Sequence, residues 1–136
     1  MSAKQITGKI AIPALLSIVA SLSGCAGSSS EATLLAKKQA QNISMNLPVQ
    51  SEGYTLISAQ NRGTLIKMNI ISESTGQHAM APGTFLDRFQ FRICTDPAVK
   101  TMMNEGIHYV ITINEIRSGN QYQRKLDRTV CEMTKI

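Results

Sequence analysis

Three cysteines, Cys25, Cys94 and Cys131, are the residues whose chemistry is easiest to infer from the sequence. Cys25 stands apart because it ends the run Leu22–Cys25, in which two small residues precede the thiol. Small residues allow an extended backbone to enter a peptidase, and the thiol that follows can accept a diacylglycerol group. Cys25 is therefore a candidate site for attachment of lipid.

The residues before Cys25 have the composition of a secretory signal peptide. Lys4 and Lys9 provide a short positive region, and the mainly apolar run 10–22 follows it. This run is well short of the roughly 20 residues that a helix needs to span a bilayer. We therefore expect residues 1–24 to be a cleavable signal, and with Cys25 they resemble the lipobox of bacterial lipoproteins. An ordinary signal peptide cut elsewhere, with Cys25 a spare thiol, is the alternative.

The lipobox resemblance implies three acyl chains in all on the processed Cys25. Each buried methylene contributes about 0.8 kcal/mol, so more than one chain gives stable anchoring. Ala26, rather than an aspartate, follows the cysteine, which resembles lipoproteins of the outer membrane. Residues 25–31 are then the lipidated N-terminus and a small, polar, flexible tether, and residues 32–136 form the folded domain. The expected location is the periplasmic face of the outer membrane.

Cys94 and Cys131 remain as a pair in an oxidising compartment, where disulfides persist. A disulfide closing a loop of this length would stabilise the fold by about 3–4 kcal/mol. Two separate buried thiols are the alternative. No CxxC motif is present, and His78 and His108 have no ligand spacing between them, so we expect neither a metal site nor a cofactor.

Charge argues against a nucleic-acid partner. Without Lys4 and Lys9, the chain keeps 12 Lys and Arg against 9 Asp and Glu, a net charge of +3. Its best basic cluster is Arg124, Lys125 and Arg128, which has no aromatic residues interleaved. A solvated face of a strand explains this cluster better than a nucleic-acid surface does.

Motifs for catalysis are absent. The sequence contains no GxSxG, P-loop, GxGxxG or HExxH pattern. His108 lies near a predicted strand start, where a structural histidine is commoner than a catalyst. The carboxylates are scattered without paired spacing, although such pairs are fixed in space rather than in sequence. We therefore expect a protein that is not an enzyme.

Hydrophobic periodicity predicts seven elements in the order α-β-β-α-α-β-β. Apolar steps of three and four residues indicate helices, alternation indicates strands, and Asp96 with Pro97 is typical of a helix start. The pattern predicts a single α+β domain: an antiparallel β-sheet of about four to five strands, with α-helices packed on one face. The expected ranges are a helix at 33–46, strands at 54–60 and 64–73, helices at 82–94 and 97–105, and strands at 107–117 and 121–131.

Several longer stretches resemble the AspS-type, or GspS-beta, pilotins of the type II secretion system. They are 54–57, 63–73, 94–100, 105–107, 111–113 and above all Gly119–Thr129. The resemblance implies a lipoprotein chaperone that binds the disordered C-terminal segment of the secretin GspD and carries it to the outer membrane. It also implies a disulfide between Cys94 and Cys131. Monomer is the default oligomeric state.

The third predicted strand carries apolar residues on both faces, since Val110 and Ile116 lie opposite the face of Tyr109 and Ile111. A sheet covered on one side should alternate more cleanly. Some of these residues could therefore meet a helix-forming peptide in an apolar groove between a helix and the sheet, although a second layer of helices would explain them as well. The candidates for partner contact are Val110, Ile116 and Leu126 on strands and Leu35 and Ile43 on the first helix.

Two other classes of function remain open from the sequence. An envelope lipoprotein that binds a small apolar ligand or lipid in its own cavity is the first. A small envelope hydrolase or hydrolase inhibitor is the second. A disordered partner that gains helix on binding would distinguish a pilotin from both.

Overall fold

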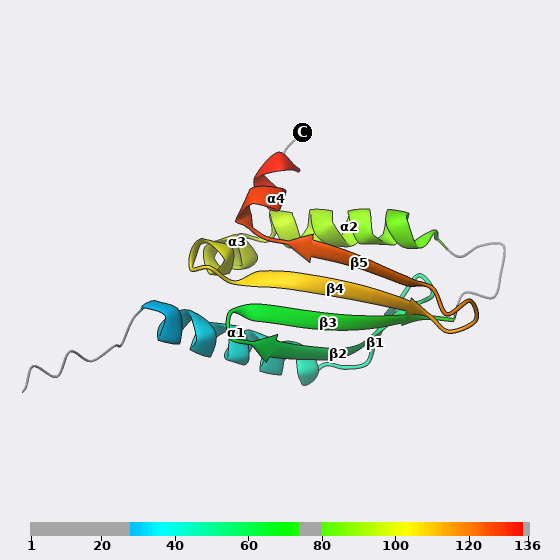
Figure 1. The fold of residues 1–136 in the computed structure, drawn as a ribbon, viewed down its shortest axis with the longest axis horizontal. Helices are drawn as coiled ribbons and strands as arrows, with labels where there is room; N and C mark the ends of the chain where they lie inside the picture. The colour runs from blue at the N-terminus through cyan, green and yellow to red at the C-terminus, as the bar shows by residue number, and fades with distance from the viewer. Residues whose placement is uncertain (1–27, 74–79, 135–136) are drawn as a thin grey trace, which may run out of the picture.

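The computed structural model describes residues 28–73 and 80–134, and the predicted signal peptide, Cys25 and His78 lie outside them. The described residues form four helices and five strands (Figure 1). None of these helices has the length and apolar character needed to cross a membrane. In chain order the elements are α1 (Ser28–Ser44), β1 (Val49–Ser51), β2 (Tyr54–Arg62), β3 (Leu65–Ser72), α2 (Pro82–Thr95), α3 (Pro97–Asn104), β4 (His108–Glu115), β5 (Gln121–Leu126) and α4 (Arg128–Met133).

The strands form one sheet in sequence order, β1-β2-β3-β4-β5. This architecture confirms the α+β class and the predicted order of elements, to which it adds β1 and α4. One pairing differs from the prediction: β3 and β4 run parallel, while the other neighbours are antiparallel. The sheet is therefore mixed. The physical reason is that α2 and α3 form a long crossover between β3 and β4, and parallel neighbours require such a connection.

All four helices pack on one face of the sheet and share a single hydrophobic core. Ile66, Met68 and Ile70 of β3 point into this core because alternate side chains of a strand lie on the same face. The register places each of them beside a fully buried residue of β4, and these partners are Tyr109, Ile111 and Ile113. In Figure 1 the strands face the viewer, with α1 along β2 and α2 along β5.

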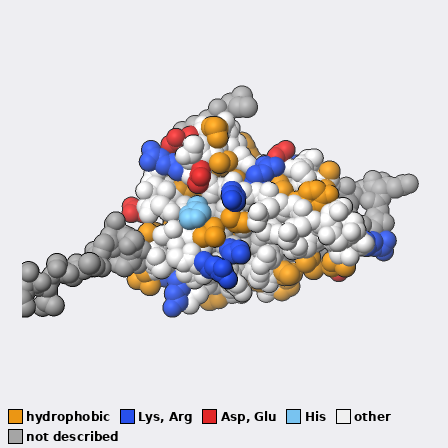
Figure 2. Space-filling view, viewed as in Figure 1, with side chains coloured by type: hydrophobic (Ala, Val, Ile, Leu, Met, Phe, Trp, Pro, Cys, Tyr) orange, Lys and Arg blue, Asp and Glu red, His pale blue; other side chains and the backbone are white. Residues whose placement is uncertain are grey.

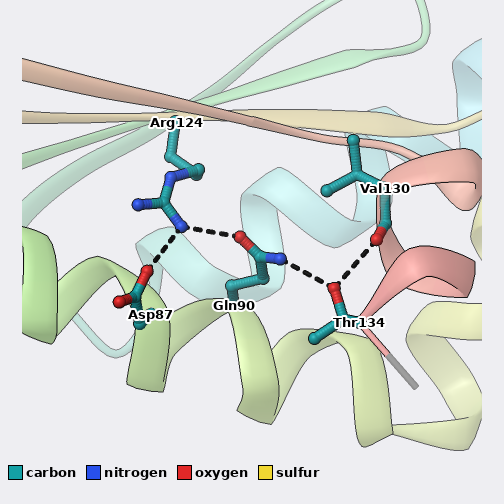
Figure 3. Close-up of polar contacts among 5 residues, drawn as sticks. All are labelled: Asp87, Gln90, Arg124, Val130 and Thr134. Carbon is teal, nitrogen blue, oxygen red and sulfur yellow. Dashed lines mark hydrogen bonds and ion pairs between the residues drawn. The ribbon is translucent and has the colours of Figure 1, made fainter. Parts of the chain in front are cut away.

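A chain of polar contacts fastens α2 to β5 and α4 (Figure 3). The Arg124 guanidinium donates to Asp87 Oδ1 at 2.9 Å and to Gln90 Oε1 at 2.8 Å. The Gln90 amide donates to Thr134 Oγ1 at 2.7 Å, and that hydroxyl donates to the carbonyl oxygen of Val130 at 2.8 Å. These contacts hold α2 in place above the sheet.

A disulfide joins Cys94, near the end of α2, to Cys131 in α4, so the expected pair is present. The surrounding structure corrects one prediction. The range 121–131 was expected to be one strand, but β5 ends at Leu126 and α4 follows. Asp127 causes the change because its Oδ1 accepts a hydrogen bond from the Val130 N–H at 2.8 Å, which caps the new helix.

Candidate functional site

An apolar groove of about 120 Å³ lies between the β1–β2 hairpin and α2, on the helix-covered side of the sheet. Ten residues from β1, the turn after it, β2, β3 and α2 line this groove. They are Val49, Ser51, Glu52, Tyr54, Leu56, Ile70, Phe85, Arg88, Phe89 and Arg92. The four residues from α2 are spaced by three and four positions, which places them on one face of the helix.

Buried aromatic and aliphatic side chains form the floor of the groove. Tyr54 and Ile70 are each 1% exposed. The Tyr54 and Phe85 rings stack with centroids 4.1 Å apart, and Phe85 stacks on Phe89 at 6.0 Å. Phe89 is only partly buried against the core, so one part of its ring remains available to a ligand.

The Tyr54 hydroxyl donates a hydrogen bond to the carbonyl oxygen of Met80. Burial raises the pKa of this phenol, and the negative charge of Glu115 adds to the shift. Tyr54 therefore remains neutral at physiological pH and presents the groove with its ring rather than with a charge.

Charged residues occupy the mouth of the groove. Arg88 forms an exposed ion pair with Glu52 at 3.0 Å. Arg92 also lines the groove, and within residues 28–73 and 80–134 it makes no ion pair. The mouth therefore combines an apolar slot with one guanidinium that is free to meet an acidic group.

The β1–β2 hairpin places Val49 and Glu52 at this mouth. Its register pairs Ser51 with Tyr54, so Glu52 and Gly53 form a two-residue turn. Both have positive φ, 54° and 87°, as the tight turn of a right-twisted hairpin requires. Sequence reasoning missed β1, and the signal that could have found it was this Gly-containing turn before an apolar strand.

The five residues predicted to contact a partner do not come together in one groove. Leu126 is 1% exposed and belongs to the core, so the structure gives no support for its predicted contact with a partner. The physical reason is that Leu126 pairs with Tyr109 on the helix-covered face. Leu35 and Ile43 of α1 are partly buried and also pack against the core.

Val110 and Ile116 lie elsewhere. Val110 is on the face of the sheet that the helices leave uncovered, and it is 7% exposed because neighbouring strands shield it. Ile116 follows the end of β4 and is 58% exposed. A partner role for these two residues stays a prediction, and the groove residues Val49, Leu56 and Phe89 are the ones that sequence reasoning did not select.

The part of the chain that the structure describes contains no candidate metal-binding site. No three His, Cys, Asp or Glu side chains gather there in a way that could hold a metal ion. A larger cavity of about 170 Å³ lies between α3 and α4, but most of its lining is charged or polar, with Lys100, Asn104, Arg128 and Glu132. The groove at α2 is therefore the better candidate for an apolar ligand.

Comparison with known proteins now shows the family. The family model for the type II secretion system (T2SS) pilotin, S protein, matches residues 28–131, and the chain belongs to this family. Over 135 residues it is 57% identical to Pilotin AspS 2 of Escherichia coli O78:H11 (strain H10407 / ETEC), with 99% of each chain covered. It has the same identity and coverage with Lipoprotein YghG of Escherichia coli (strain K12).

Solved structures agree with this assignment. The chain is 51% identical to a chain in the cryo-EM structure of the ETEC pilotin–secretin AspS–GspD complex, with a TM-score of 0.52 and coverage of 72% of this chain and 89% of that chain. The pilotin AspS from Vibrio cholerae has the same fold, with a TM-score of 0.67 at 18% identity, and the match covers 76% of this chain and 95% of that chain.

Proposed function

We propose that this chain is a lipid-anchored pilotin that binds the C-terminal segment of the type II secretin GspD and carries it to the outer membrane for assembly. The observation that carries the proposal is its 51% identity to a chain of a pilotin–secretin complex. The groove between the β1–β2 hairpin and α2 is the binding site in this proposal, and the domain acts as a chaperone rather than as an enzyme.

The groove suits one face of an amphipathic helix. A helix presents apolar side chains at steps of three and four residues to a groove. A volume of about 120 Å³ accommodates an apolar anchor from such a helix rather than the whole helix. Phe89 and Leu56 would contact that anchor, and Arg92 would attract an acidic residue beside it.

The same volume argues against the alternative of a small apolar ligand or lipid held in a cavity of its own. Sites for small molecules usually enclose roughly 300–1,000 Å³. The groove at α2 is well below this range, and a wider hollow of about 350 Å³ between α1 and β2 is lined mainly by polar residues such as Lys37, Gln41 and Gln60, which do not suit an apolar ligand. A peptide side chain that enters from outside is therefore the better occupant.

The lipid anchor in this proposal is Cys25, exposed as the new N-terminus after cleavage of residues 1–24. The name of the relative Lipoprotein YghG, at 57% identity over 99% of both chains, supports it. The anchor would hold the domain at the periplasmic face of the outer membrane, and the secretin segment would follow because it is bound to the domain.

Calorimetry with a synthetic peptide from the C-terminus of the host's own GspD tests the binding site. Phe89→Asp should weaken binding at least about 30-fold, or 2 kcal/mol, because it puts a charge in a dry contact. Phe91→Asp is the matched control: Phe91 is on the same helix, is 60% exposed and does not line the groove. Its affinity should be unchanged.

Val49→Asp is a second test variant that should stay folded. Val49 lines the groove from the short strand β1 and is 47% exposed, so a charge there should not disturb the core. The variant should weaken binding of the peptide while the thermal melt stays near that of the wild type. Equal affinities for the Phe89, Val49 and Phe91 variants would exclude this groove. Absence of binding by the wild-type domain at high micromolar peptide would contradict the proposed function itself.

A further inference from the structure

The face of the sheet that the helices leave uncovered has a basic end. Arg62 at the end of β2, Lys67 on β3 and Lys125 on β5 point to this face, and Val110 lies between the two lysines in the register. His108 begins β4 at the same end. We call Arg62, Lys67, Lys125 and His108 the basic sheet end.

The basic sheet end carries an excess of positive charge. Of the strand residues whose register places them on this face, none is Asp or Glu. Within residues 28–73 and 80–134, no ion pair involves Arg62, Lys67 or Lys125. Asp127 follows β5 near this end and caps α4 with its carboxylate. Its single negative charge leaves the three cationic side chains Arg62, Lys67 and Lys125 in excess. Figure 2 shows blue side chains near the pale-blue histidine, with a red side chain and orange side chains beside it, while the middle of the sheet face is largely white.

The chain enters the domain at this same end. The helix α1 begins at Ser28, which is earlier than the expected start at residue 33 and lies within the range 25–31 expected to be a tether, so it starts three residues after Cys25. Three residues span at most about 11 Å. In Figure 1 the start of α1 lies at the end of the molecule where β3 and β4 begin and where β2 and β5 finish. A lipid on Cys25 would therefore keep the basic sheet end close to the membrane surface.

We propose that the basic sheet end docks on the anionic phospholipid headgroups of the membrane that holds Cys25. The inference rests on the lipid anchor of the proposed function. Lys and Arg side chains near an anionic surface each raise the binding constant about five-fold, which corresponds to about 1 kcal/mol. Docking through the uncovered face turns the helix-covered face, which carries the groove, away from the lipid. The secretin segment can then enter the groove while the domain stays on the membrane.

A headgroup-quenching experiment tests the orientation. The acylated mature protein is purified from envelopes and reconstituted in phosphatidylethanolamine vesicles with or without phosphatidylglycerol. A fluorophore is attached through Gln123→Cys, an exposed site on the uncovered face, and the lipid headgroups carry a spin-label quencher. We expect quenching only with phosphatidylglycerol, and we expect it to disappear in 1 M salt, where the screening length falls to about 3 Å.

Charge reversal supplies the matched comparison. Lys67→Glu with Lys125→Glu should lower the docking constant at least about 25-fold. Lys37→Glu with Lys38→Glu makes the same change in net charge on α1, at positions that are exposed on the helix-covered side, and it should leave quenching intact. Equal losses in the two variants, or equal quenching in neutral vesicles, would overturn the orientation.

Two further outcomes are distinguishable. Protein that stays on the vesicles in 1 M salt but never shows quenching keeps its lipid anchor and refutes the docking face. Protein that washes off in 1 M salt lacks the anchor, and the proposed function fails. If the lysine reversals abolish binding of the GspD peptide and leave quenching unchanged, the face belongs to a protein partner, which also overturns the inference.

Discussion

Asp96 and Asp127 each begin a helix through a single side chain. Asp96 Oδ1 accepts from the Ala98 N–H at 2.8 Å, and Asp127 Oδ1 accepts from the Val130 N–H at the same distance. The first cap was predictable because Pro97 follows it. The second was not, because Leu126 and Val130 fit the alternation of a strand that continues through Asp127.

Replacement of Asp127 by alanine should lower the free energy of unfolding by about 1 kcal/mol, because a free N–H at the start of α4 loses its acceptor. Asp127→Asn retains an oxygen acceptor and should recover most of this loss. Denaturant unfolding of the three proteins measures both effects. Equal destabilisation by alanine and asparagine would mean that the cap is not the source of the stability.

Val110→Asp distinguishes two candidate binding sites for the GspD peptide: the groove at α2, which the structure indicates, and the site with Val110, which was expected from the sequence. Val110 lies on the uncovered face between Lys67 and Lys125, away from the groove at α2. The variant should therefore bind the GspD peptide with wild-type affinity, since its carboxylate faces two lysines rather than the peptide. Calorimetry, with a melting curve to verify folding, checks this. A large loss of affinity in a folded variant would indicate that the peptide binds to the uncovered face of the sheet rather than to the groove at α2.

Among the elements, α2 does most to define the groove, and it is held from two directions. The contacts of Arg124 and Gln90 tie it to β5 and α4, and the disulfide ties its last turn to α4. One face of α2 contributes Phe85 and Phe89 to the groove. A fixed position of α2 therefore means a preformed groove, which lowers the cost of ordering a site when a disordered peptide binds.

Removal of the disulfide tests how much this covalent bond contributes to the stability of the fold that holds α2 in place. Cys94→Ser with Cys131→Ser should lower the free energy of unfolding by about 3–4 kcal/mol, because the unfolded chain regains the freedom of a loop with a sequence separation of 37. Denaturant unfolding measures the loss, and reductant should destabilise the wild type but not the double variant. Rapid alkylation of either cysteine in the untreated native protein would contradict the pairing.

Sequence patterns predicted which residues of each element face the core, but not how the elements pair. The alternation of Ile66, Met68 and Ile70 marks a buried face whichever way the neighbouring strand runs. The parallel pairing of β3 with β4 depends instead on where α2 and α3 return the chain. The groove could not be predicted either, since Val49 and Phe89 line one groove only after α2 is placed over the sheet.

On the scale of the whole molecule, the two faces of the sheet have different chemistry. Helices and the apolar groove occupy one face, and the other carries mainly polar side chains with a few apolar ones, such as Leu65, Val110 and Ile71, and a basic end. A lipid anchor at the basic end and a peptide in the groove can therefore be engaged together. This separation is what a chaperone that binds a protein segment and a membrane at the same time requires.

Fractionation of envelopes from the organism that encodes this chain tests the central claim most directly. GspD should be found as assembled rings in the outer membrane of wild-type cells. Without the chain, or with Cys25→Ala, GspD should be lost from the outer-membrane fraction, and the wild-type chain supplied in trans should restore it. Normal amounts of assembled GspD in the outer membrane of cells that lack the chain would contradict a pilotin function.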